Sequence, residues 1–237
     1  EFDPAWEKIQ DIFVINLASE KARWFDTLFG LCKLQAPLNR VRRFDAIRDD
    51  GSKFTVDHKK PVDKWMMGTA GVSRSQIGCV EKFLQSTSDM QKNMDVKSAP
   101  SPLKEKYALF LEDDFTPDEN VEDHLRDLHE YFRRPYDPKQ IVLCATSKYW
   151  KLEPHDDLFN SSRQTCTTCC GYLLSTTAAR ALLPVWKEGL EQLYKTRDTN
   201  QYACDRYWVK LQPFLSFRRK FGYQRPSQSS IYGKFTC

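Results

Sequence analysis

The feature that most constrains the fold of this 237-residue chain is an apolar run that ends in three consecutive carboxylates. Residues 107–111 (Tyr-Ala-Leu-Phe-Leu) are typical of a strand buried on both faces of a parallel sheet. Glu112, Asp113 and Asp114 follow at its carboxyl end, where ligands of open α/β sheets bind. Hard divalent cations prefer oxygen ligands, so the triplet predicts a Mg²⁺ or Mn²⁺ site. The alternative is a solvated acidic turn before a helix that Asp114 or Asp118 caps.

The composition indicates a globular α/β chain with a sizeable core. Hydrophobic residues make up 41% of the sequence and aromatic residues 13%. The length suits one large domain, and no linker divides the chain, so we expect a single domain over residues 1–237. The eight cysteines leave the disulfide state open.

The net charge and the hydropathy of the chain limit the classes of partner that we expect. The net charge of +4 is mild and its basic residues are spread, so we expect no nucleic-acid binding. No apolar run reaches membrane-spanning length, so we expect no membrane span. The compartment stays open between the cytoplasm and, if an upstream signal or anchor was removed, the Golgi or endoplasmic reticulum lumen. The oligomeric state is open as well.

The beginning of the chain predicts a nucleotide-binding unit. Residues 11–17 read as a buried strand, and apolar positions from Trp24 to Cys32 give the next helix a buried face. Residues 40–46 read as a second strand. A strand, a turn and a helix open a doubly wound fold, but no glycine-rich loop is present. We therefore expect neither a dinucleotide fingerprint nor a P-loop.

The region before the acidic triplet predicts a flap and a helix. Residues 49–71 are polar and contain Gly51, Pro61 and Gly68, which favours a long surface excursion that closes over a ligand. Ser73 and Gln76 fit a capping box, so a helix is expected to begin at Ser73. Residues 86–106 read as a loop.

The later elements are predicted from short apolar runs and turn residues. We expect residues 148–163 to be irregular and the helix over 177–183 to end or kink at Pro184. Asp205 is expected in the first turn of a short helix. Further strands are expected at 141–145, 171–175 and 214–217.

Several of these pieces, taken in order, resemble glycosyltransferase family 25, which includes lipooligosaccharide and procollagen β-galactosyltransferases. The matching pieces are 12–17 (Ile-Phe-Val-Ile-Asn-Leu) with Arg23, 44–47 (Phe-Asp-Ala-Ile), 76–79 (Gln-Ile-Gly-Cys), 111–114 (Leu-Glu-Asp-Asp), 171–175 (Gly-Tyr-Leu-Leu-Ser), Asp205, and 226–231 (Pro-Ser-Gln-Ser-Ser-Ile). The chain departs from the family pattern at Gln76, where the family has Glu, and at Lys82-Phe83, where it has Ser-His. The first glycine of the Gly-x-x-Gly-Tyr segment is also missing.

The resemblance implies an A-type, Rossmann-like glycosyltransferase fold with a mostly parallel central sheet. Residues 10–146 would bind the nucleotide sugar and residues 147–237 would face the acceptor. The implied reaction is an inverting, metal-dependent transfer of a hexose, galactose or glucose, from a UDP-sugar to a hydroxyl of a glycan or glycoprotein. Mn²⁺ or Mg²⁺ is the implied cofactor.

The resemblance also implies roles for individual residues. Glu112, Asp113 and Asp114 would hold the metal, and Asp205 would be the general base. The implied nucleotide-sugar contacts are Asn16, Leu17, Arg23, Asp45, Ala46, Gln76 and Gly78. The implied acceptor or sugar contacts are Gly171, Tyr172 and Gln228.

Two rival functions remain open at this level. A catalytically degenerate family member that acts as a binding or scaffold protein would explain the departures at Gln76 and Lys82-Phe83. A metal-dependent nucleotidyl or phosphoryl transferase also uses acids after a strand, but this chain lacks a phosphate-cradling glycine loop. Incubation with a nucleotide sugar separates these classes. A glycosyltransferase releases free sugar, a nucleotidyltransferase releases pyrophosphate, and a scaffold protein releases neither.

Overall fold

The computed structural model describes residues 3–57, 61–94, 105–146, 152–162, 168–219, 221–225, 227–228 and 235–236. Its helices are α1 (Lys21–Lys33), α2 (Lys64–Met94), α3 (Val121–Arg133), α4 (Thr176–Thr196), α5 (Thr199–Tyr202) and α6 (Cys204–Tyr207). The strands of the main sheet are β1 (Ile9–Asn16), β2 (Val41–Asp45), β3 (Tyr107–Glu112), β5 (Val142–Leu143), β7 (Leu152–Pro154), β8 (Phe159–Ser162), β9 (Gly171–Ser175) and β10 (Phe214–Phe217). Smaller sheets contain β4 (Phe115–Pro117), β6 (Ala145–Thr146) and β11 (Gly222–Gln224), and β12 (Ser227–Gln228) with β13 (Phe235–Thr236).

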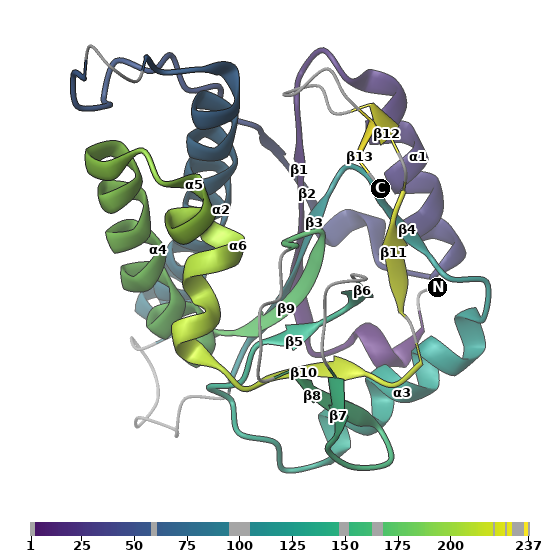
Figure 1. The fold of residues 1–237 in the computed structure, drawn as a ribbon. Coiled ribbons are helices and arrows are strands. Elements are labelled where there is room, and N and C mark those ends of the chain that lie inside the picture. Colours follow the sequence, from purple (N-terminus) through teal and green to yellow (C-terminus); the bar gives the residue numbers. More distant parts are fainter. Residues whose placement is uncertain are drawn as a thin grey trace.

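The fold is α/β, with an eight-stranded mixed sheet flanked by helices (Figure 1). The strand order is β2-β1-β3-β9-β5-β10-β8-β7, so strands from both halves of the chain share one sheet. Only three of its seven neighbouring pairs are parallel: β1–β2, β1–β3 and β5–β10. The expectation of a mostly parallel sheet was wrong because β9 runs antiparallel between β3 and β5. A buried apolar run reads alike in either direction, so the sequence pattern does not encode that choice.

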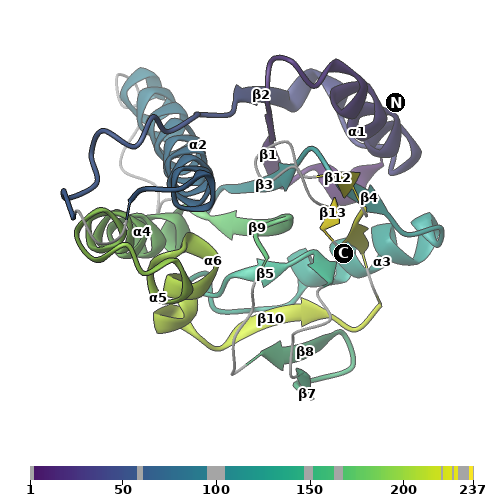
Figure 2. The ribbon, with the colours of Figure 1, turned by 45° about the horizontal axis from the view of Figure 1, so that its top comes forward.

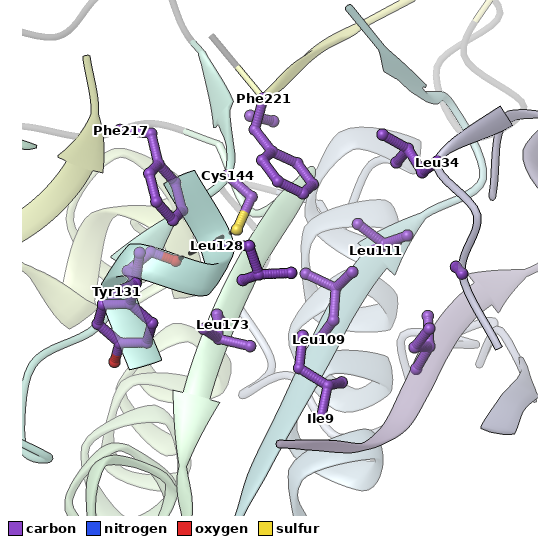
Figure 3. Close-up of a cluster of buried hydrophobic side chains, with 14 of the residues drawn as sticks. Ile9, Leu34, Leu109, Leu111, Leu128, Tyr131, Cys144, Leu173, Phe217 and Phe221 are labelled. Atoms are coloured by element: carbon purple, nitrogen blue, oxygen red, sulfur yellow. Dashed lines mark hydrogen bonds between the residues drawn. The ribbon is translucent and has the colours of Figure 1, made fainter. Parts of the chain in front are cut away.

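Alternating side chains of the central strands pack against two separate helical layers. Val14, Leu109 and Leu173 face α1 and α3 in one core, shown in part in Figure 3. The residues between them pack in a second core with α2, α4 and α6. Figure 2 shows these helices on the other side of the sheet from α1 and α3. There the rings of Phe110 and Tyr172 stack with centroids 5.1 Å apart. Burial on both faces is what makes these strands continuously apolar.

Helix α2 is longer at both ends than the sequence pattern indicated. It begins at Lys64, where an Asp63 carboxylate oxygen accepts a hydrogen bond from the Met66 amide at 2.8 Å. Ser73 lies inside the helix and donates to the carbonyl of Thr69, so the expected helix start at Ser73 was wrong. The helix also runs to Met94, through part of the expected loop.

Two further expectations after residue 147 differ from the structure. The helix expected over 177–183 does not end at Pro184, since α4 continues to Thr196 with Pro184 inside it. An interior proline costs about 3 kcal/mol, but α4 buries Leu182, Trp186 and Leu193 on one side, and this burial offsets the cost. The segment expected to be irregular contains β7 and β8, which pair with each other.

The segment expected to form an irregular flap is anchored over most of its described length. Phe54 is 5% exposed and packs with Met66 and Leu193, while the Thr55 amide donates to the Tyr194 carbonyl at 3.0 Å. Residues 64–71 belong to α2, and residues 58–60 lie outside the described ranges. The interpretation of 49–71 as one irregular surface excursion was therefore wrong.

Within the described ranges, no helix combines the length and the apolar character that crossing a bilayer requires. The six cysteines described there carry free thiols.

We predict that Phe54→Ala lowers the free energy of unfolding by about 3–5 kcal/mol, because it opens a cavity between α2 and α4. Val56→Ala is the matched control, since Val56 is 78% exposed and its truncation should change stability by less than about 0.5 kcal/mol. Urea denaturation measures both variants. Equal effects of the two substitutions would contradict the anchoring of this segment.

Candidate functional site

The carboxyl ends of three neighbouring strands create the site. β2, β1 and β3 are parallel, so their ends meet at one edge, with Asn16 beside Asp45 and Ile15 beside Glu112. A cleft of about 350 Å³ opens there, against α2. Its lining residues are Ile15, Leu17, Arg23, Ala46, Ile47, Arg48, Asp49, Lys64, Met67, Gly68, Gly71, Val72, Ser75, Gln76, Glu112, Asp113, Asp114 and Gln224.

Helix α1 holds the middle carboxylate of the triplet. Asn16 donates to one oxygen of Asp113 at 2.7 Å, and Arg23 donates to the other at 2.9 Å. The Thr27 hydroxyl donates to the Asp113 carbonyl at 3.0 Å, which pins the main chain as well. Burial raises the pKa of Asp113, and the contacts to Asn16 and Arg23 oppose that rise. The amide oxygen of Asn16 is buried with no hydrogen-bond partner in the described part of the chain.

Helix α2 and β9 hold Glu112, the first carboxylate of the triplet, through two neutral side chains that are hydrogen-bonded in series. The Tyr172 hydroxyl donates to the Gln76 amide oxygen at 2.6 Å, and the Gln76 amide nitrogen donates to Glu112 at 3.1 Å. Burial, together with the negative charges of Asp114 and Asp113, raises the pKa of Glu112 to about 8. Glu112 therefore has hydrogen-bond support without a neutralising cation in direct contact.

The third carboxylate faces β11 and the start of β9. Asp114 accepts hydrogen bonds from the Gln224 amide at 3.0 Å and from the Cys170 thiol at 3.5 Å. Its carbonyl accepts from the Arg225 amide at 2.7 Å. Burial raises the pKa of Asp114. Because β3 ends at Glu112 and the next two acids form a turn, the carboxylates point toward three different elements rather than alternating along an extended strand.

Asp205 lies beside this group on α6. It is half-buried in the first turn of that helix and does not line the cleft itself. Burial raises its pKa to about 6, and its negative charge contributes to the raised pKa of Glu112. The Cys204 thiol, one residue earlier, lies 3.9 Å from the Cys169 thiol beside β9. α6 thus brings a carboxylate with a pKa near neutrality close to the acidic turn.

The other residues expected to contact a nucleotide sugar separate into two groups. Leu17 and Ala46 line the cleft, and the Ala46 amide donates to the Asn16 carbonyl at 3.0 Å. Asp45 lies outside the lining, with a carboxylate 77% exposed and paired with Arg43. Gly78 also lies outside it, and a Cβ there would stand 2.6 Å from the Phe44 ring. The structure thus gives Gly78 a packing role between α2 and β2.

The residues expected on the acceptor side also differ in position. Gly171 opens β9 opposite Leu111, and Tyr172 is fully buried, so it reaches the cleft only through Gln76. Gln228 belongs to β12, and its side chain lies outside the described part of the structure.

Sequence reasoning missed the α2 wall of the cleft. Lys64, Met67, Gly71 and Ser75 recur at helical spacing on one face, a signal that was hidden because residues 49–71 were interpreted as a flap. A Cβ at Gly71 would stand 2.6 Å from the Ile47 carbonyl oxygen, so glycine permits the close approach of helix and loop. Gln224 had no sequence signal, because it reaches Asp114 only through long-range pairing of β11 with β4.

The chemistry of the donor set fits one divalent cation. Glu112 and Asp114 have neutral hydrogen-bond partners, whereas Asp113 is paired with Arg23. Mg²⁺ is commonly held by one or two carboxylates together with substrate phosphates. Across the described ranges, no three His, Cys, Asp or Glu side chains are grouped to enclose a metal by themselves.

Comparison of the chain with protein-family models and with curated proteins finds no match.

The raised pKa of Glu112 leads to a prediction about stability. Between pH 5 and 8 the folded protein keeps a proton on Glu112 that the unfolded chain has lost, so stability falls as pH rises. Glu112→Gln stays neutral and removes this loss. In EDTA, its free energy of unfolding relative to wild type should therefore rise by about 1 kcal/mol or more from pH 5 to pH 8. Denaturation curves at several pH values measure this, and a constant difference would contradict it.

Proposed function

We propose that this protein is an inverting, metal-dependent glycosyltransferase that moves a hexose from a UDP-sugar to a hydroxyl of a glycan or glycoprotein, on an A-type fold. The observation that carries the proposal is the buried acidic turn at the floor of a cleft that also presents Arg23, Arg48 and Lys64. Cationic side chains can bind a diphosphate. Carboxylates whose hydrogen-bond partners are neutral, here Glu112 and Asp114, can bind the metal ion that accompanies the diphosphate. The resemblance to family 25 supplies the reaction class.

Glu112 and Asp114 would hold the metal. When bound, a divalent cation neutralises the charge that develops on a departing nucleoside diphosphate. Asp113 has a different role in this proposal, because its hydrogen bond orients the Arg23 guanidinium toward the cleft. Arg23 then contacts the phosphates from one side, while Lys64 and Arg48 contact them from the α2 side.

The apolar wall of the cleft suits the uridine. Ile47, Met67 and Val72 line it beside the cations, and they provide contact area for a base and ribose. Ser75 is committed to the fold, because its hydroxyl accepts a hydrogen bond from the Ile47 amide at 2.8 Å. The donor pocket thus has an apolar wall opposite a charged floor.

Asp205 is the general base in this proposal. An inverting transfer needs a general base to accept the proton of the attacking hydroxyl, and a carboxylate can serve as one. With a pKa of about 6, Asp205 is ionised at neutral pH yet basic enough to share that proton.

A second function is favoured by one specific observation. Each carboxylate of the triplet already has protein hydrogen-bond partners, and a neutral Gln76 stands where the resembling family has an acid. A nucleotide-sugar-binding protein without transfer would use the same cleft. Such a protein shows UDP-dependent stabilisation but releases no sugar.

Metal-dependent nucleotide binding is the first test of the proposed donor site. UDP with Mn²⁺ at about a hundred times its Kd should raise the melting temperature of the wild type by about 5–10 °C. Asp114→Asn should abolish the Mn²⁺-dependent part, because it removes one metal ligand. Asp45→Asn is the matched control, since that carboxylate is exposed outside the cleft, and it should retain the full shift. Equal Mn²⁺-dependent shifts of the melting temperature in both variants would show that the acidic turn does not belong to the donor site.

Transfer is the second test. Asp205→Asn should keep the UDP–Mn²⁺ shift and lower sugar release from UDP-galactose or UDP-glucose by about a hundredfold or more. The wild-type rate should also fall below about pH 6, where Asp205 becomes protonated. A wild type that binds UDP with Mn²⁺ but neither releases nor transfers sugar supports the binding-protein function. Near-normal turnover of Asp205→Asn would show that another residue is the general base.

A further inference from the structure

Trp65 differs from the other tryptophans that the structure describes. Trp6, Trp186 and Trp208 are at most 1% exposed and Trp24 is half-buried, whereas Trp65 is 51% exposed. Burying an aromatic side chain of this size is worth several kcal/mol, on the order of 25 cal/mol per Å² of apolar surface. A large exposed indole is therefore a feature that folding does not explain.

The indole is nevertheless held in one orientation. Its Nε1–H donates to the hydroxyl of Thr199 at 3.0 Å, which joins the start of α2 to the start of α5. Asp198 caps α5 by accepting hydrogen bonds from the amides of Asn200 and Gln201, so Thr199 is itself fixed. Trp65 thus presents its exposed aromatic surface without a large loss of side-chain freedom on binding.

Trp65 lies on the strip of α2 that leads to the acidic turn. At 100° per residue, Trp65, Val72 and Gln76 fall within about 20° of one direction, and Gly68 lies beside them. Gly68, Val72 and Gln76 line the cleft, and Gln76 binds Glu112. With a rise of 1.5 Å per residue, Trp65 stands about 16 Å from Gln76 along the helix. That span suits a short oligosaccharide with its reactive end at the acids.

The exposed groups around the indole are polar. Lys64 adjoins it on α2, and the amides of Asn200 and Gln201 follow Thr199 on α5, all three exposed. A pyranose ring combines an apolar C–H face with a rim of hydroxyls. Its C–H groups suit the negative π face of an indole, and its hydroxyls suit amides and an ammonium group. A protein partner would instead favour a contiguous apolar patch, which these neighbours do not provide.

We propose that Trp65 is the stacking platform of a saccharide subsite at the outer end of the cleft, where the acceptor glycan binds. This rests on the proposed function for the direction of transfer, but the subsite is a binding site in its own right. The segment that orients Trp65 also carries Asp205, since α5 leads directly into α6. Figure 2 shows α5 and α6 together beside α2 and α4. An acceptor stacked on Trp65 is therefore held by the same segment as the proposed base.

Saturation-transfer NMR with lactose, maltose and N,N′-diacetylchitobiose, each at millimolar concentration with UDP and Mg²⁺, tests the subsite. The wild type should bind at least one of these disaccharides. Trp65→Ala should weaken that binding about tenfold, and Trp65→Phe should retain most of it because a ring remains. Thr199→Val keeps the shape but removes the orienting hydrogen bond, so its loss should be intermediate. Val56→Ala, exposed and outside the cleft lining, should bind like the wild type.

Two outcomes overturn the proposal: no disaccharide binds the wild type, or Trp65→Ala binds as well as the wild type does. Melting curves of each variant show that a loss of binding does not come from unfolding. The UDP–Mn²⁺ shift, measured on Trp65→Ala, separates the two proposals. If Trp65→Ala keeps the UDP–Mn²⁺ shift and binds the disaccharide as well as the wild type does, only the saccharide subsite is refuted. Trp65-dependent saccharide binding with no UDP–Mn²⁺ shift in the wild type refutes the donor site alone.

Discussion

The structure depends on the burial of three adjacent carboxylates at the end of a central strand. Such a cluster is unfavourable unless each acid finds hydrogen-bond donors. The donors come from α1 and the end of β1 for Asp113, from α2 for Glu112, and from β11 and Cys170 for Asp114. Strands β1 and β3, helix α2 and strand β11 all meet at this turn. The arrangement of elements around the cleft therefore follows from holding these acids in place.

The support of the triplet is electrically uneven. Arg23 compensates the charge of Asp113, whereas Glu112 and Asp114 are held by neutral amides and a thiol. Burial raises the pKa of both acids, and the negative charges of Asp114 and Asp113 add to that rise at Glu112. The proposed donor site uses this difference, with Arg23, Arg48 and Lys64 on the walls of the cleft and the carboxylates at its floor.

Helix α2 serves the core and the cleft at once. Ile77, Val80 and Phe83 pack in the core shared with α4, while the face that includes Lys64, Gly71 and Gln76 lines the cleft. Trp65 stands at the edge between these faces, fixed to α5 by one hydrogen bond. Helix α2 thus places Lys64 and Gln76 in the lining of the cleft and carries the exposed Trp65 next to Lys64.

The sequence by itself determined the buried strands and the acidic turn at a strand end, because these depend on local periodicity and composition. It predicted the buried face of the first helix only in part, since Leu31 is buried but Cys32 is exposed. Tertiary structure alone decided the antiparallel direction of β9, the continuation of α4 through Pro184, and the contact of Gln224 with Asp114. It also turned Asp45 out of the cleft and placed Asp205 near Glu112. These outcomes depend on which distant segments pack together, and the free energy of that packing outweighs the local preferences that a sequence pattern records.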